Sequence, residues 1–583
     1  MTNYFFWKNW SAGNQTLYSL LFLLFTSLLG LTAYLFELGN DGIIHWQKQG
    51  ELEVVDIVLD RFDKHFFEFT QEADAYLLKE KFTATDLEIP LYIYYAYLFV
   101  LALGSVVVLA ALPALSRLGF LVGMGIIILT WATMGFESLK IFYEIYDKLF
   151  AMLFIVSFSL LAFFFHYIRK NIDLYWRFLA FTILFIGWYF LMQDLTEIAY
   201  PLVHLSVYGI AFPIVITVVF IIFNAHEIYR FFIYLTTNET LNSGKNNSQR
   251  YWFITLLFLA HAIYTYFHFT ENIDYDIFFI HPIYIFIITA FLGIWGFKKR
   301  EIQYQNIMSF QTEGAFLYIG TGLIALSAVI FALATVNDPL IEVYEDAVIY
   351  TQIGFGVGIS LYTYANFKDL LAAGQPVYKV FYKPLYFDYL YKVFTAGLLI
   401  GSLLLYNNFF TYRQAFAGYF NGLGHLSKLL DDTFSSKQYY NIATGYDPRN
   451  HHSFYALGNL ALAARNNGAA AIFFEDALSK KTSPYAYAAL GEIQFKQKEY
   501  LQAILTYQEG IERCKQNGEL YNNLALLLNE RGLLPDSVLL HFEVGMQTAE
   551  VPEVLQSNTF TLWTKYNIFQ SLDSVYGDSK PIP

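Results

Sequence analysis

Histidine and carboxylate side chains gather near the ends of several apolar segments, where they could bind a metal ion or carry protons. His204 opens one such segment, His268 and Glu271 end the next, and His281 opens the one after it. Imidazole nitrogens and carboxylate oxygens are common zinc ligands, and histidine titrates near neutral pH. These four residues are therefore candidates for a divalent-metal site or a proton relay. The competing interpretation is that they are polar side chains wetted by lipid headgroups at a membrane interface.

Other acidic residues at segment ends are candidates for catalysis. Glu37 and Asp41 follow the first apolar segment, and Asp194 and Glu197 end the fifth. Together with His268 they are the side chains placed to act as a general base on a substrate carried by a lipid. The sequence contains no HExxH motif and no glycine-rich phosphate loop outside the apolar segments. The pattern consequently names neither a reaction nor a cofactor.

The composition indicates which kind of fold must position these residues. Of 583 residues, 56% are hydrophobic and 15% are charged, whereas soluble proteins carry about a quarter charged residues. Much of the chain must therefore lie in lipid, which excludes a wholly soluble enzyme. The net charge of −13 disfavours a nucleic-acid partner. The single cysteine, Cys514, permits no internal disulfide.

Runs of about 20 apolar residues predict eleven membrane-spanning helices in a domain that covers residues 1–412. The predicted spans are 17–37, 90–112, 116–137, 147–168, 174–193, 201–225, 251–269, 280–297, 314–336, 346–366 and 391–410.

The charges of the connecting loops predict the orientation of these spans. One set of alternate loops is basic, as at 298–300, and the set between them is acidic, as at 338–346. Basic loops mark the cytoplasmic side of a membrane. We therefore expect a cytoplasmic amino terminus and an external carboxy-terminal part. The Phe, Tyr, Ile and Asn richness suggests a bacterial chain, so the predicted location is the inner membrane, with the external part in the periplasm.

The long external loop at 38–89 carries a stripe of apolar residues at alternating steps of three and four. No proline or glycine interrupts it between Glu51 and Asp86. Such a heptad pattern predicts a long helix over 51–86. That helix either packs against its own chain or forms a seam with a partner or a second copy. Candidate partner-binding residues in the stripe are Leu52, Leu59, Phe62, Phe66 and Phe69.

A repeat with a period of 33 or 34 residues follows the last predicted span. Its first two units carry an aromatic residue, Leu and Gly in the first half, and Ala with an aromatic residue in the second. The positions are Phe454, Leu457, Gly458, Ala470, Phe474 and Ala477, then Tyr487, Leu490, Gly491, Ala503, Tyr507 and Gly510. A third set begins at Tyr521 and departs from the pattern at His541.

These residues resemble the tetratricopeptide repeat (TPR) family over about 417–548. The resemblance implies an α-solenoid domain over 417–583, closed by a capping helix, and a concave surface that binds protein segments. It implies no catalysis. Tyr487 and Tyr521 are the candidate partner-binding residues on this domain.

The sequence thus predicts an all-α protein, a polytopic membrane bundle followed by an external TPR solenoid. We expect an inner-membrane scaffold that gathers other envelope proteins during cell-envelope assembly or export, with membrane lipid around it and a possible homo- or hetero-oligomer. One alternative is a glycosyltransferase or ligase that uses a lipid-linked substrate. The membrane part is similar to GT-C-type glycosyltransferases in layout, but the acidic external loops disfavour a lipid phosphate. A second alternative is a cation or proton pathway.

Overall fold

The computed structural model describes residues 5–64, 67–141, 148–238, 247–270, 272–273, 279–514, 516–532 and 535–566. The chain divides into two compact units. The membrane unit comprises residues 1–39 and 89–447. The repeat unit comprises residues 40–88 and 448–583.

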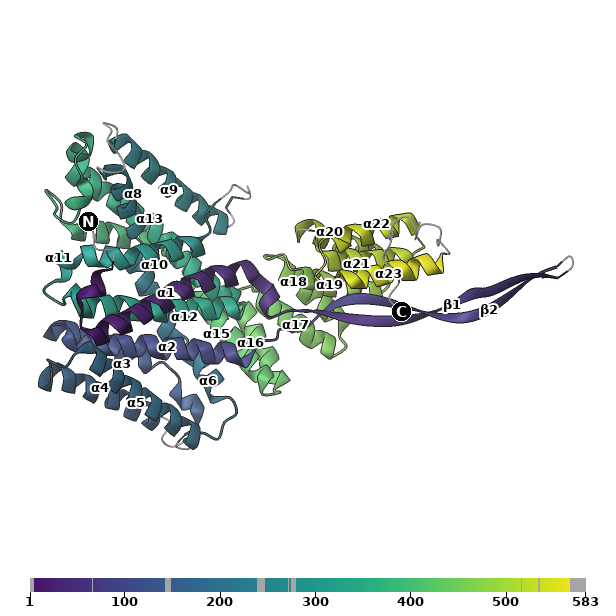
Figure 1. Cartoon of the computed structure of the whole chain (residues 1–583), viewed down its shortest axis with the longest axis horizontal. Helices are drawn as coiled ribbons and strands as arrows, with labels where there is room; N and C mark the ends of the chain where they lie inside the picture. Colours follow the sequence, from purple (N-terminus) through teal and green to yellow (C-terminus); the bar gives the residue numbers. More distant parts are fainter. Residues whose placement is uncertain are drawn as a thin grey trace. The chain divides into compact units, whose positions relative to one another are not determined.

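The membrane unit is helical throughout its described residues (Figure 1). Its longer helices are α1 (Ala12–Leu38), α2 (Leu91–Ala111), α3 (Arg117–Trp131), α4 (Leu149–Phe163), α5 (Leu174–Leu195), α6 (Pro201–Tyr208), α7 (Ala211–Asn224), α8 (Glu227–Thr237), α9 (Asn247–Phe269), α10 (Pro282–Lys299), α12 (Ala315–Ala334), α13 (Asp338–Ala372), α14 (Tyr389–Tyr406), α15 (Phe410–Leu429) and α16 (Thr433–Tyr446). The short α11 (Glu301–Tyr304) and several single turns connect them.

Nine helical stretches among the described residues are long and apolar enough to cross a membrane. They are Ala12–Leu38, Leu91–Ala114, Leu149–Ile168, Leu174–Leu195, Ala211–Thr237, Asn247–Phe269, Pro282–Lys299, Ala315–Ala334 and Tyr389–Tyr406. The protein is therefore a multi-pass membrane protein, as its composition predicts.

Two of the eleven predicted spans are not among these nine. The predicted span 116–137 contains α3, which has only 15 residues. The predicted span 346–366 lies within α13, a helix of 35 residues whose amino-terminal half carries the buried carboxylates Glu345 and Asp346. In addition, 201–225 is divided between α6 and α7, and the apolar stretch continues through α8 to Thr237.

Small residues allow the central helices of the membrane unit to approach closely. Helix α12 is the most buried of the nine stretches, with 83% of the residues in its apolar stretch inside the protein. A Cβ atom added to Gly104 of α2 would lie 2.9 Å from the carbonyl oxygen of Gly320 in α12. Because hydrophobic burial gives little drive for helix association inside lipid, close backbone contact of this kind stabilises the pair.

The described part of the repeat unit contains three helix pairs followed by one more helix, and Figure 1 shows these helices beside the hairpin. The pairs are α17 (His451–Ala463) with α18 (Asn467–Leu478), α19 (Pro484–Lys496) with α20 (Tyr500–Arg513), and α21 (Gly518–Glu530) with α22 (Pro535–Met546); α23 (Pro552–Lys565) follows. First helices begin every 33 or 34 residues, as the sequence predicts. Helix α16 and the part of α15 from residue 417 onward fall in the predicted 417–583 domain, but both helices belong to the membrane unit.

Contacts between a glycine and an aromatic ring recur within the repeat. A Cβ atom on Gly458 would lie 2.8 Å from the ring of Phe474, and one on Gly491 would lie 2.6 Å from the ring of Tyr507. Each glycine lies on the first helix of a pair and each ring on the second. The glycine therefore makes room for the ring, which explains the period that the sequence shows.

The predicted helix over 51–86 is wrong, because this region is a long β-hairpin. Strand β1 (Trp46–Lys64) pairs antiparallel with β2 (Phe67–Ala84), from Trp46 opposite Ala84 to Lys64 opposite Phe67. The register shifts once, between Val58 and Asp60. The protein is consequently mostly helical rather than all-α.

Two physical causes favour strands here over the predicted helix. The run from Val54 to Val58 holds four β-branched residues, whose side chains fit a pleated strand better than a helix. In addition, β2 contacts α19, α21 and α23 of the repeat unit. These helices lie hundreds of residues away in the chain, and contact with them favours the strand over the helix. The heptad stripe carries no information about that contact.

Candidate functional site

The repeat unit grips strand β2 through asparagine side chains that bond to its backbone. Asn523 of α21 accepts a hydrogen bond from the Phe82 N–H at 2.9 Å and donates to the Phe82 carbonyl at 2.7 Å. Asn558 of α23 binds Glu80 in the same way, at 2.9 and 2.7 Å. Each asparagine thus replaces a neighbouring strand, because its amide offers one donor and one acceptor.

Two further side chains extend this row of contacts. Asn522 donates to the Glu80 carbonyl at 3.0 Å, and Thr561 donates to the Leu78 carbonyl at 2.7 Å. The carbonyls of residues 78, 80 and 82 are therefore all bonded to helix side chains, at the two-residue spacing of a strand edge. We call Asn522, Asn523, Asn558 and Thr561 the asparagine groove.

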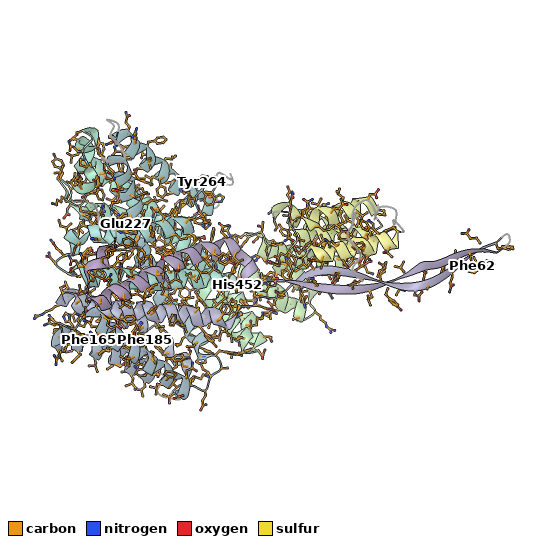
Figure 2. The ribbon with its side chains drawn as sticks, viewed as in Figure 1. Phe62, Phe165, Phe185, Glu227, Tyr264 and His452 are labelled. Carbon is orange, nitrogen blue, oxygen red and sulfur yellow. The ribbon has the colours of Figure 1, made fainter. Side chains whose placement is uncertain are left out.

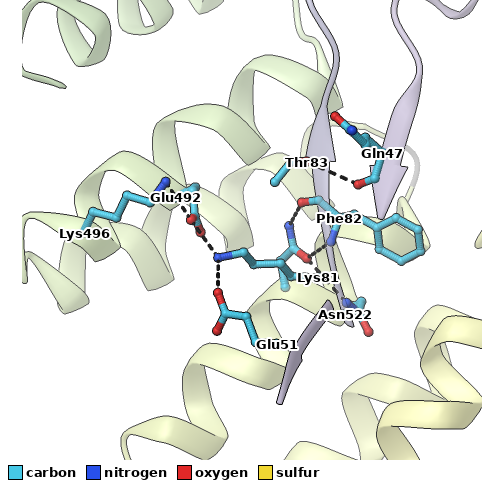
Figure 3. Close-up of polar contacts among 9 residues, drawn as sticks. Gln47, Glu51, Lys81, Phe82, Thr83, Glu492, Lys496 and Asn522 are labelled. Carbon is cyan, nitrogen blue, oxygen red and sulfur yellow. Dashed lines mark hydrogen bonds and ion pairs between the residues drawn. The ribbon is translucent and has the colours of Figure 1, made fainter. Parts of the chain in front are cut away.

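Ion pairs flank the asparagine groove (Figure 3). Lys81 lies 2.9 Å from Glu51 of β1 and 3.0 Å from Glu492 of α19. Burial opposes the charge of Lys81, but the Glu492 and Glu51 carboxylates outweigh it and raise the pKa of this ammonium group. These pairs fix the hairpin laterally, while the asparagines hold its backbone.

A second lysine pair lies at the other end of the groove. Lys565 of α23 and Lys79 of β2 lie 2.8 and 2.7 Å from the carboxylate of Glu53. Burial opposes the negative charge of Glu53, but the two lysines prevail and lower the pKa of this carboxyl. The charged form of Glu53 is therefore the form that stabilises the folded repeat unit.

Phe82 anchors β2 in the core of the repeat unit. Its side chain is 1% exposed and belongs to the cluster that includes Tyr507 and Leu524. The Trp46 ring of β1 packs against Phe82, with ring centroids 6.1 Å apart. The asparagine groove thus binds backbone atoms of β2, whereas Phe82 and the lysine ion pairs add contacts that depend on particular side chains.

The hairpin leaves large apolar side chains exposed both beside the groove and toward its far end. Beside the groove, Leu52 is 68% exposed; farther out, Phe62 is 48% exposed and Phe69 is 47% exposed. Phe62 stacks on Phe69 with ring centroids 5.6 Å apart, and Figure 2 shows Phe62 at the end of the hairpin away from the helices. The side chain of Leu59 and the whole of Phe66 lie outside the described residues.

The two tyrosines predicted to bind partners have different surroundings. Tyr487 is 3% exposed and packs against Gly510, with its hydroxyl 3.3 Å from Glu509. Tyr521 is partly buried beside His541. Their role in partner binding stays a prediction, and Tyr487 contributes to the core in this structure.

The predicted catalytic residues that the structure describes have different surroundings. Glu37 accepts a short hydrogen bond from the Tyr284 hydroxyl, and Phe36 packs on the His281 ring at 4.3 Å. Asp194 and Glu197 are both exposed. The side chain of Asp41 lies outside the described residues, and Asp41 belongs to the other unit.

Two of the predicted metal ligands share neighbours. His268 and His281 both contact the ring of Phe279, at 5.2 and 6.2 Å between centroids, whereas His204 stacks on Tyr208. Within the described residues, no group of three or more His, Cys, Asp or Glu side chains could hold a metal ion. Glu271 lies outside those residues, so the metal prediction stays untested.

A buried charge network in the membrane unit is absent from the sequence prediction. The Glu227 carboxylate, fully buried in the helix bundle (Figure 2), lies 2.6 Å from Arg230 and 3.1 Å from Arg300. His226 lies 3.2 Å away, and Gly296 has no side chain to fill the space that the carboxylate occupies. The network links α8 with α10 and fixes their packing.

The groove asparagines are also absent from the sequence prediction, although one signal exists. Asn522 and Asn523 are adjacent in the middle of α21, where asparagine is a poor helix former because it competes for backbone hydrogen bonds. Two such residues inside a helix that the repeat pattern predicts indicate a role outside the helix itself.

A scan against protein-family models and a search of curated proteins found no match to the chain.

Proposed function

We propose that this protein is a membrane-anchored scaffold that gathers other envelope proteins during cell-envelope assembly or export. The hairpin is the observation that supports this proposal. Side chains of the repeat unit form hydrogen bonds with its backbone at one end, and apolar residues are exposed at the other end. Soluble surfaces rarely keep such residues exposed without a binding role. The resemblance of the helix pairs to tetratricopeptide repeats supports the same function.

In this proposal the repeat unit lies in the periplasm of a bacterial cell. The basic and acidic loops alternate in the sequence, and basic loops favour the cytoplasmic side. A cysteine introduced at Phe62, in a chain with Cys514→Ser, tests the orientation. We expect a membrane-impermeant maleimide to label it in intact spheroplasts; labelling only after lysis would place the repeat unit in the cytoplasm.

The scaffold proposal is tested by comparing three full-length chains in their native membranes: the unsubstituted chain and two variants. The variant Asn522→Ala/Asn523→Ala/Asn558→Ala releases the hairpin, and Gln508→Ala, an exposed amide on α20, is the matched control. Chains are crosslinked in cells, purified, and their partners quantified by mass spectrometry. We expect a defined set of envelope proteins to be lost from the triple variant alone. Equal recovery from all three chains would contradict the proposal.

A transferase that uses a lipid-linked substrate is the second candidate, favoured by a large apolar cavity. The cavity has a volume of about 850 Å³ and is lined by Phe99, Trp131, Phe185 and Tyr189, among others. This size and lining suit a hydrocarbon chain. Glu37→Gln would abolish transfer from a lipid-linked donor if Glu37 is the base. An unchanged rate of transfer in Glu37→Gln would show that Glu37 is not the base.

A further inference from the structure

The backbone hydrogen bonds of the hairpin determine which of its groups point outward. The Thr85 N–H donates to the His45 carbonyl at 2.9 Å, so these opposed residues form a hydrogen-bonded pair. Such pairs alternate along an antiparallel ladder. The opposed pairs 48/82, 50/80, 52/78, 54/76 and 56/74 therefore direct their N–H and C=O groups away from the partner strand.

The two outer edges of the hairpin differ in what covers them. On β2, the asparagine groove takes the outward groups of residues 78–82. On β1, no described group bonds to the outward backbone groups between Lys48 and Asp56. A nine-residue edge is thus open along β1, and open edges of this kind accept additional strands.

Apolar side chains lie along this open edge on one face of the hairpin. Leu52 faces Leu78, and Val54 faces Tyr76. The four side chains are 68%, 41%, 57% and 67% exposed, in that order. Opposed residues share a face, so these two neighbouring pairs form one apolar patch. We call Leu52, Val54, Tyr76, Leu78 and the open β1 edge the docking face.

Two carboxylates follow directly on the same face. Asp56 lies opposite Asp74, and neither forms an ion pair with a described cation. Like charges at directly opposed positions destabilise a two-stranded sheet. From Val54 to Tyr76 the sequence has six acidic residues and two basic ones. A basic side chain supplied by a partner would relieve this repulsion, whereas a second acidic hairpin would increase it.

We propose that the docking face binds an extended segment of another protein, which adds a third strand along β1. That segment carries apolar residues opposite Leu52 and Val54, and a lysine or arginine that reaches Asp56 and Asp74. The proposal rests on the scaffold function and names its partner chemistry. Backbone pairing supplies the affinity, and the acidic pair selects the charge of the partner.

Three fluorescent ten-residue peptides test this with the full-length chain in lipid nanodiscs. One carries valine at two alternate positions and lysine at the next alternate position, so that all three side chains lie on one face of the strand. One has glutamate in place of that lysine, and one is the lysine peptide with N-methyl groups on its pairing edge. Fluorescence anisotropy gives each affinity. We expect the lysine peptide to bind at least tenfold more tightly than either of the others. The proposal would be overturned if the glutamate peptide bound as tightly as the lysine peptide. It would also be overturned if the methylated peptide bound as tightly as the unmethylated lysine peptide.

Two variants locate the site. Asp56→Lys/Asp74→Lys reverses the charge without altering the backbone, and we expect it to prefer the glutamate peptide at least tenfold. Val54→Pro removes one outward N–H, and we expect weaker binding than for the control Val54→Ala, which keeps it. An unchanged preference in the charge-reversed chain would place peptide binding elsewhere and overturn the inference.

The remaining outcomes separate this inference from the scaffold function. A disulfide between two copies of a Val54→Cys chain, without peptide binding, would assign the docking face to a second copy and refute a foreign partner. Envelope proteins lost on hairpin release, with no peptide preference, would leave the scaffold standing and refute this inference. Peptide binding as expected, with no envelope protein dependent on the hairpin, would support the inference and contradict the scaffold.

Discussion

Replacing Asn523 with alanine isolates the contribution of one groove contact. The change leaves the Phe82 N–H and C=O without their bonds of 2.9 and 2.7 Å, next to a side chain that is 1% exposed. An unsatisfied buried polar group costs about 1–3 kcal/mol. Water can reach part of the opened groove, so we expect a loss of about 2–4 kcal/mol for the two groups together.

Hydrogen exchange at single amides is the direct measurement. The Phe82 amide points away from β1 and is protected only by Asn523, whereas the Lys81 amide faces Gln49 within the hairpin. In Asn523→Ala we expect Phe82 to exchange about 30- to 700-fold faster, since 1.4 kcal/mol corresponds to tenfold. Lys81 should change little. The full-length chain in nanodiscs, with residue-level mass spectrometry, resolves the two amides.

Gln508→Ala is the matched control, because Gln508 is an exposed amide on α20 of the same unit. It should leave both exchange rates unchanged. A Phe82 rate in Asn523→Ala within threefold of the unsubstituted chain would refute backbone capture by the groove. Equal acceleration at Phe82 and Lys81 would show instead that the whole hairpin frays, which contradicts the separate protection of its outer edge.

Three further predictions concern packing and charge. Gly491→Ala places a Cβ atom 2.6 Å from an aromatic ring, and we expect it to destabilise the repeat unit by about 1–3 kcal/mol in thermal unfolding. The control Gly468→Ala, where the added Cβ atom has only one neighbour at 3.9 Å, should not destabilise it. Glu227→Gln leaves two arginines without their buried counter-ion and should lower the free energy of unfolding by about 3–5 kcal/mol, which a lower melting temperature in detergent would show. The control Glu197→Gln, at an exposed residue, should leave the melting temperature unchanged. The lowered pKa of Glu53 makes its ion pairs stabilising above its ordinary value of 4.5 and lost as the pH falls through the lower folded value. Because the intrinsic exchange of amides itself slows in acid, protection factors are compared, and acid should lower those of β2 more in the unsubstituted chain than in Glu53→Gln. Each prediction would be contradicted if the variant and its control, or the unsubstituted chain and Glu53→Gln, gave the same unfolding, melting or exchange result.

The sequence predicts those parts of the fold that depend on local patterns. Apolar runs of about 20 residues identify span-length helices because a bilayer imposes that length. The spacing of Gly458, Gly491 and their partner rings identifies the paired helices, because each glycine makes room for a ring one helix away. Both features are confirmed in the structure as a multi-pass membrane unit and a run of short paired helices.

The features that the sequence does not predict arise from residues far apart in the chain. The stripe through Leu52 and Phe62 fits a heptad as well as a strand, and only contact with α21 and α23 decides between them. Similarly, Glu227 and Arg230 resemble an ordinary pair at a helix end until Arg300 joins them. Distant partners of this kind leave no periodic signal.

The division of the repeat unit into residues 40–88 and 448–583 imposes an order on biosynthesis. A ribosome completes the hairpin before it makes most of the membrane helices, and it makes Asn523 and Asn558 only after all of the helices from α2 to α16. Until then the outward amides of Glu80 and Phe82 have no partner, and β2 is open to proteases and to wrong strands. A chain cut short before α21 never covers them. Capture of the hairpin therefore waits until α21 and α23 have been made.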